Sequence, residues 1–329
     1  MKNVTAKNAK NSPSRASCVA IIGCGNVGTA CAYALLLDPL VRELVLIDQD
    51  VSKAEGEAMD LQHAVPVGAP VTVTAGSYKQ VAESAIVILT AGAASKSGES
   101  RLDLLEENVA ITRECIERLM AEHFNGVLLI TSNPVDILAQ IAQRESGLPM
   151  SQVVGSGTVI DTARLRVLLG TALGVEARAV HAYVIGEHGD SAVAAWSAAH
   201  IAGIPLSSYP GAAELPPYDE LLASVRQAAQ EVVARKGNTC FAIASCVTRI
   251  CKAILGDEHT VLAVSTLMEG QYGLQDIYLS TPCVVGASGV ERVLELPLNE
   301  KEQSGLHASA NVLRSALQGC RRSRVHSPR

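Results

Sequence analysis

The segment Gly186-Glu187-His188-Gly189-Asp190 contains a histidine with a glycine beside it, so its imidazole can face a ligand. Imidazole titrates near pH ~6.5 and can therefore accept or release a proton at cellular pH. Upstream, Asp161 and Arg164 are three residues apart and would share one face of a helix. The carboxylate could orient the histidine, and the guanidinium could hold a substrate carboxylate through two parallel hydrogen bonds. Taken alone, these residues are also compatible with a turn histidine and a surface ion pair.

A second clue lies near the N-terminus, where a strand, a glycine-rich turn, a helix and another strand follow in order. The apolar run 18–22 is typical of an interior parallel strand, and it leads into Gly23-Cys24-Gly25-Asn26-Val27-Gly28. The helix expected over 26–37 stops before Pro39, and a second apolar strand over 44–47 ends at Asp48.

Each residue type in this pattern has a role in binding a dinucleotide. Gly23 allows a tight turn, Gly25 lets the backbone approach the pyrophosphate, and Gly28 lets helix and strand pack closely. The pyrophosphate would contact the free N–H groups at the helix start, at Asn26 and Val27. Asp48 stands where an acid accepts hydrogen bonds from the adenosine ribose, and its charge would repel a 2′-phosphate. The pattern therefore predicts NAD rather than NADP as cofactor.

Composition narrows the class of protein. The 329 residues are enough for one large or two ordinary domains, and the net charge of −6 with 3% aromatic residues argues against nucleic-acid binding. The nine cysteines form no CxxC pair, and we expect reduced thiols in a cytoplasmic protein.

No apolar run approaches ~18 residues, so we expect no membrane span, and the polar N-terminus is unlike a secretory signal. No cluster has metal-ligand spacing, so we expect no metal.

The alternation of strands and helices predicts an α/β fold. We expect an N-terminal Rossmann domain with a doubly wound parallel sheet over 18–156 and a C-terminal α+β substrate domain over 157–318. Residues 1–17 are expected to form a flexible arm and residues 319–329 a basic disordered tail. The turns Thr90-Ala91-Gly92 and Ser132-Asn133-Pro134 follow strands and should face the cofactor.

For the second domain the apolar patterns predict a mixture of elements. Helices are expected over 160–173, 190–203, 219–236 and 238–255, and strands over 179–185, 261–268, 276–285 and 290–297.

With these motifs in place, the chain resembles the lactate/malate dehydrogenase family, and within it the lactate enzymes. The resemblance runs from about Ala20 to about Arg314 and preserves the order of the motifs. Besides the glycine loop and the two segments described first, the family motifs are the active-site loop Ala91–Leu104 and the segment Thr131-Ser132-Asn133-Pro134-Val135-Asp136-Ile137-Leu138.

This resemblance implies roles for individual residues. His188 is similar to the family's proton donor and acceptor, and Asp161 to its orienting carboxylate. Arg164 is similar to the anchor of the substrate carboxylate, and Arg101 to the loop arginine that polarises the reacting carbonyl. Asn133 is similar to the residue that bonds the substrate oxygen and the nicotinamide. The implied reaction is reversible reduction of pyruvate to L-lactate.

One position departs from the family pattern. Asp136 and Thr239 resemble the lactate enzymes, but Ser95 stands where lactate enzymes have glutamine and malate enzymes have arginine. A short neutral serine offers no cation to the second carboxylate of oxaloacetate and leaves room for larger 2-keto acids. A related L-2-hydroxy acid dehydrogenase, acting on larger 2-keto acids or on malate with Lys96 as the cation, therefore stays an alternative. A non-enzymatic nucleotide-binding module is a further alternative, although it would not need the catalytic set.

Arg166 and His181 are candidates for a regulatory site. Arg166 lies two residues beyond Arg164 and should project from a different side of the helix, and His181 begins the extended segment that leads to His188. Both could be ordinary surface residues. However, both match positions at which allosteric bacterial members of the family bind fructose 1,6-bisphosphate at a subunit interface. The resemblance thus implies a homotetramer and a possible sugar-bisphosphate effector.

Overall fold

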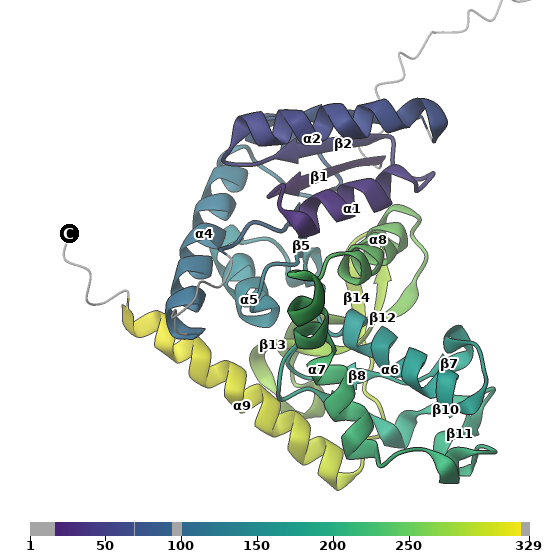
Figure 1. The fold of residues 1–329 in the computed structure, drawn as a ribbon. Coiled ribbons are helices and arrows are strands. Elements are labelled where there is room, and N and C mark those ends of the chain that lie inside the picture. The colour runs from purple at the N-terminus through teal and green to yellow at the C-terminus, as the bar shows by residue number, and fades with distance from the viewer. Residues whose placement is uncertain (1–16, 69, 94–100, 324–329) are drawn as a thin grey trace, which may run out of the picture.

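The computed structural model in Figure 1 describes residues 17–68, 70–93 and 101–323, without the side chains of 101–103 and 320–323. Its centre is a nine-stranded sheet of order β14-β13-β12-β6-β5-β4-β1-β2-β3. The parallel strands are β1 (Cys18–Ile22), β2 (Glu43–Ile47), β3 (Thr72–Ala75), β4 (Ile86–Leu89), β5 (Val127–Ile130) and β6 (Val153–Gly155). The antiparallel strands β12 (Thr260–Glu269), β13 (Gln275–Gly286) and β14 (Gly289–Val293) extend the same sheet beyond β6. The predicted doubly wound sheet is confirmed.

The two faces of the sheet form two separate apolar cores, because successive side chains of a strand point to opposite faces. In β1, Ala20 and Ile22 belong to one core, whereas Val19 and Ile21 belong to the other. The first core is covered by α3 (Tyr78–Val81), α4 (Arg101–Ala121), α5 (Val135–Ser146) and α9 (Glu300–Ser323). The second is covered by α1 (Asn26–Leu36), α2 (Val51–Ala64) and α8 (Phe241–Leu255). Burial on both faces explains why these strands are continuously apolar.

A third core supports the C-terminal part of the chain, at the lower right of Figure 1. It lies between α6 (Val159–Leu173), α7 (Tyr218–Lys236) and small antiparallel sheets. One sheet joins β7 (Val180–His181), β10 (His200–Ile201) and β11 (Ile204–Pro205), and the other joins β8 (Val184–Ile185) and β9 (Val193–Ala194).

Two predictions for this region are wrong. The apolar residues over 190–203 form no helix, because β9 and β10 pair with β8 and β7 and only one short turn, Trp196–Ala198, is helical. The expected strand over 179–185 is likewise divided at Ala182 and Tyr183, since β7 and β8 belong to different sheets. Pairing with distant segments overrides the local pattern in both cases.

The last helix, α9, was not expected from the sequence. Helix α9 continues to Ser323, so the first residues of the expected disordered tail are helical. In Figure 1 this helix runs diagonally past α4 and α5, and its apolar side includes Leu306, Ala310 and Leu313 of the first core. The other helices and strands for which a range was expected have boundaries within a few residues of that range, whereas α3, β6 and β11 were not expected from the sequence. The expected arm at 1–16 lies outside the described residues.

The strand order places the functional turns together. The chain leaves β1 through α1 toward β2 on one side, and β4 later pairs with the other side of β1. Such a reversal of direction opens a crevice beyond the carboxyl ends of the two strands, where ligands bind in doubly wound sheets. The turns after β1, β2, β4 and β5 all meet at this edge. Among the described residues, no helix has the length and apolar character to cross a membrane.

Candidate active site

The glycine loop after β1 is shaped to receive a dinucleotide. Gly23 has a φ of +107°, and a Cβ at Gly28 would lie 1.9 Å from the Gly23 carbonyl oxygen, so only glycine fits there. Gly25 is exposed and precedes α1 without a side-chain cap. The N–H groups at Asn26 and Val27, at the positive end of the helix dipole, are therefore available to an anion. This cradle fits the pyrophosphate of NAD.

Asp48 is held beside this loop at the end of β2. One carboxylate oxygen accepts a hydrogen bond from the Cys24 backbone N–H at 2.7 Å, and the other accepts from the Asp50 N–H at 3.0 Å. The side chain is half-buried. The contact to Cys24 ties the acid directly to the glycine loop, which is the placement required of a ribose-binding carboxylate.

Side chains also join the turns after β1, β4 and β5. The Thr90 hydroxyl donates to the Gly23 carbonyl at 2.7 Å, which couples the first two turns. The Asn108 carboxamide on α4 accepts from the Ala93 N–H at 2.7 Å and donates to the Asn133 carbonyl at 3.0 Å. Asn108 was not singled out from the sequence, but it is a polar residue on the buried side of α4. That placement is a sequence signal that could have identified it.

The other predicted cofactor residues lie at the same carboxyl edge of the sheet as the glycine loop. Ser132 donates a hydrogen bond of 2.5 Å to the Ala91 carbonyl, Gly92 is exposed, and the Asn133 side chain is exposed next to the turn.

Asp161 brings the two candidate chemical groups together. It lies in the first turn of α6 with its side chain 7% exposed. One oxygen is 2.6 Å from His188 Nδ1, and the other accepts a hydrogen bond from the Arg164 guanidinium at 3.0 Å. A carboxylate only accepts hydrogen bonds, so His188 Nδ1 carries a proton and Nε2 is the atom left to face a ligand.

These contacts set the protonation states. Burial favours a neutral Asp161, but the charges and hydrogen bonds of His188 and Arg164 outweigh it and lower the pKa of the acid. Burial also favours a neutral His188, but Asp161 and Asp136 outweigh it and raise the pKa of the ring. A raised pKa keeps the ring protonated to higher pH, which suits a proton donor working near neutrality.

A second carboxylate, Asp136, holds the backbone of His188. Asp136 is 2% exposed, and one of its oxygens accepts from the His188 backbone N–H at 2.8 Å. The other accepts from the Ser265 hydroxyl at 2.6 Å. Asp136 stood out in the sequence only by its family resemblance, and these contacts were not predicted, because Asp136 is far in sequence from the histidine turn and from β12.

For the remaining predicted site residues, the structure gives a position in the chain but no contact with His188 or Asp161. Thr239 is half-buried in the turn between α7 and α8, and α8 packs against α6. Arg101 begins α4, but its side chain, like Ser95 and Lys96, lies outside the described residues.

Arg166 and His181 lie side by side on the C-terminal part of the chain. Arg166 Nε donates to the Ala182 carbonyl at 3.0 Å, and its guanidinium lies over the Tyr183 ring. The His181 ring stacks on His200 with centroids 4.7 Å apart. Burial, His200 and the Arg166 charge together lower the pKa of His181. Arg164 and Arg166 leave α6 toward different partners, yet both line one hollow of about 700 Å³.

Comparison with known proteins agrees with this geometry. Residues 17–155 match the NAD binding domain of lactate/malate dehydrogenase, and residues 158–322 match its alpha/beta C-terminal domain. The chain belongs to the lactate/malate dehydrogenase family. It is 46% identical over 303 residues to an L-lactate dehydrogenase of Clostridium botulinum strain Loch Maree, covering 91% of this chain and 95% of the relative. It is 45% identical over 304 residues to the L-lactate dehydrogenase of Acetivibrio thermocellus, covering 91% and 96%.

Solved structures show the same family likeness. The minor L-lactate dehydrogenase from Enterococcus mundtii, in a ligands-bound form, superimposes with a TM-score of 0.90 at 42% identity and covers 92% of this chain and 98% of its own. A lactate dehydrogenase from a Medee basin deep-sea metagenome library gives 0.89 at 42% identity, with the same coverage. The family resemblance read from the motifs is therefore confirmed, as are the NAD cofactor and the class of NAD-dependent oxidoreductase.

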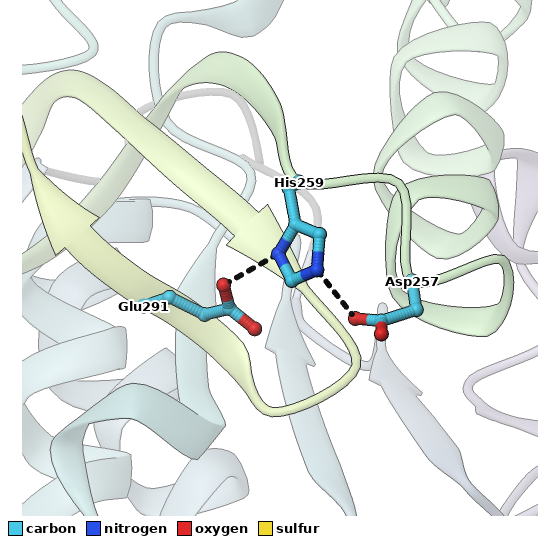
Figure 2. A group of neighbouring side chains, drawn as sticks. All are labelled: Asp257, His259 and Glu291. Carbon is cyan, nitrogen blue, oxygen red and sulfur yellow. Dashed lines mark hydrogen bonds and ion pairs between the residues drawn. The ribbon is translucent and has the colours of Figure 1, made fainter.

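In the part of the chain that the structure describes, one group of side chains could hold a metal ion: Asp257, His259 and Glu291. Figure 2 shows the His259 ring between two carboxylates, Asp257 in the loop after α8 and Glu291 on β14. Glu291 is 2.7 Å from Nδ1 and Asp257 is 3.6 Å from Nε2. Both ring nitrogens thus face a carboxylate, an arrangement that a protonated imidazole satisfies by itself. The spacing of these residues in the sequence did not reveal the group. Glu291 comes close to His259 only because β14 pairs with β13 in the sheet.

The cluster predicts a pH-dependent contribution to stability. The hydrogen bond to Glu291 and the charge of Asp257 raise the pKa of His259. A raised folded-state pKa stabilises the fold fully below the unfolded value of about 6.5 and ceases to do so as the pH rises through the folded-state pKa. We expect His259→Gln to lower the melting temperature at pH 5.5 and to leave it unchanged at pH 9. A difference of equal size at both pH values would contradict this account.

Proposed function

We propose that the protein is an NAD-dependent L-lactate dehydrogenase that interconverts pyruvate and L-lactate, with His188 as general acid and base. One observation carries the proposal: a single buried carboxylate, Asp161, bonds both His188 and Arg164. The relatives named above are L-lactate dehydrogenases. A nucleotide-binding module without turnover would have no use for a buried acid shared between an imidazole and a guanidinium.

The chain's own groups account for the remaining steps. Bound NADH supplies the hydride that reduces the carbonyl carbon of pyruvate. Protonated His188 donates its Nε2 proton to the ketone oxygen, while Asp161 orients the ring and stabilises its charge. Arg164 binds the substrate carboxylate through two parallel hydrogen bonds. Arg101 stabilises the negative charge developing on the oxygen, an interaction worth roughly 3–4 kcal/mol in known oxyanion sites.

Asn133 and Thr239 complete the proposed substrate contacts, and the glycine loop with Asp48 and the turn at Thr90, Ala91 and Gly92 holds the cofactor. The described cysteines are all free thiols, which supports a cytoplasmic enzyme.

Loss of the proposed acid should separate binding from turnover. We expect His188→Asn to reduce kcat for pyruvate by at least ~10²-fold, the usual scale for removing a general acid. NADH affinity, measured by fluorescence titration, should stay close to that of the parent because the ring lies outside the glycine loop. Normal turnover in this variant would refute the assigned mechanism.

We propose that Ser95 sets the preference for the substrate side chain. Ser95→Arg should raise kcat/KM for oxaloacetate relative to pyruvate, because a guanidinium bonds the second carboxylate. Ser95→Gln should narrow the preference toward pyruvate over longer 2-keto acids. Steady-state NADH oxidation with the three substrate types measures these ratios. A parent enzyme that already prefers oxaloacetate would overturn the proposal and point to Lys96.

We further propose a homotetramer in which Arg166 and His181 bind fructose 1,6-bisphosphate at a subunit interface. A two-fold axis would present two copies of each residue to the two phosphates. Their proximity supports a joint role, as does the lowered pKa of His181, which an incoming phosphate would reverse.

If so, fructose 1,6-bisphosphate lowers the KM for pyruvate, and more strongly below pH ~6.5, where imidazole gains its proton. Kinetics should show this activation in the parent and its loss in the double variant Arg166→Gln, His181→Gln. Activation that survives in the double variant, or a parent that responds at no pH, would exclude the site.

A further inference from the structure

Two carboxylates from different helices hold His188, and only one of them touches its ring. Asp161 on α6 contacts Nδ1 at 2.6 Å, whereas Asp136 in the first turn of α5 accepts from the His188 backbone N–H at 2.8 Å. Asp136 is 2% exposed, so its charge acts on the imidazole with little screening by water. An acid in the first turn of a helix is also stabilised by the helix dipole.

On its far side Asp136 faces two serine hydroxyls, whose hydrogen bonds favour the ionised form. Its second oxygen accepts from the Ser265 hydroxyl of β12 at 2.6 Å and lies 3.4 Å from the Ser280 hydroxyl of β13. Both serines are fully buried, and Ser280 itself accepts from the Thr158 N–H at 3.1 Å. Three hydrogen-bond donors on one buried carboxylate offset much of its desolvation cost.

The charged neighbours of Asp136 act in opposite directions. The pKa of Asp136 is raised to about 6, because burial and the charge of Glu187 outweigh the bonds from Ser265 and His188 and the charge of His188, which lower it. In return, Asp136 raises the pKa of His188 together with Asp161, and Arg164 lowers it. Ionisation of Asp136 and protonation of His188 therefore favour each other.

We propose that Asp136 is a positioning residue that anchors the backbone of the histidine turn and, when ionised, makes the His188 ring a stronger base. The inference rests on the proposed function, since it assigns a task to Asp136 only if His188 donates the proton. Asp161 selects the tautomer and orientation of the ring, and Asp136 supplies a second negative charge that keeps the ring protonated to higher pH.

Asp136→Asn is the direct test, because the amide oxygen can still accept from the His188 N–H while its NH2 faces hydroxyls that can also accept. The matched control is Asp219→Asn, which removes an exposed carboxylate paired with Lys301. The readouts are kcat/KM for pyruvate from pH 5.5 to 9.5 and the titration of the His188 ring followed by NMR without substrate.

The expected result is a pH-dependent loss. In Asp136→Asn the fall of kcat/KM on the alkaline side moves to lower pH, so that kcat/KM at pH 9 is at least about threefold below the parent while the values near pH 5.5 agree. The NMR titration of His188 moves in the same direction, and Asp219→Asn changes neither curve. Equal loss at every pH with an unmoved His188 titration would show a purely structural role and overturn the proposal.

A second variant keeps the test decisive if Asp136→Asn does not fold. Ser265→Ala removes a donor that favours the ionised acid, so the His188 titration should again move to lower pH, by a smaller amount; an unmoved titration would overturn the proposal. The two proposals also fail separately. A parent that does not reduce pyruvate refutes the proposed function, whereas the NMR titration still decides whether Asp136 acts on His188.

Discussion

The site depends on one buried ion pair network centred on Asp161. Removing a carboxylate from water is costly, and charged groups that also donate hydrogen bonds to its oxygens offset that cost most strongly. His188 and Arg164 supply them, one to each oxygen. The same contacts that stabilise the buried acid also hold the imidazole and the guanidinium at a set separation. Losing either partner would leave a buried charge uncompensated, at a cost of about 3–5 kcal/mol. Stability of the site and readiness for chemistry therefore have the same physical origin.

The central sheet brings this network to the carboxyl ends of its parallel strands, where we propose that the cofactor binds. The parallel strands β1, β4 and β5 are apolar throughout and buried on both faces, so their polar residues lie in the turns that follow them, and the strand order brings those turns together. The antiparallel strands β12 and β13 continue the sheet and carry Ser265 and Ser280 to the back of the site. The turns that carry the cofactor residues and the supporting serines therefore belong to one sheet, and a bridge between Gly186 and Ser280 joins the start of the histidine turn to it.

Sequence was sufficient where the signal was local and insufficient where it was not. The glycine loop, Asp48 and the Asp161–Arg164 spacing could be recognised from turn chemistry and helix geometry, and in the structure Asp48 contacts the loop and Asp161 contacts Arg164. The segment over 190–203 was misassigned because alternating small apolar residues fit a helix as well as short strands, and only pairing with β7 and β8 decides. Asp136 and Asn108 acquire their roles from partners far along the chain, which no spacing rule reveals.

The most direct test of the central claim is the effect of Asp161→Asn on catalysis and on cofactor binding measured in the same preparation. The amide keeps the shape of the side chain but loses the charge that holds His188 protonated and Arg164 in place. We predict that kcat/KM for pyruvate falls by at least ~10²-fold while the Kd for NADH changes by less than about threefold. A variant with nearly parental kcat/KM would contradict the account, because the buried carboxylate would then not organise the site.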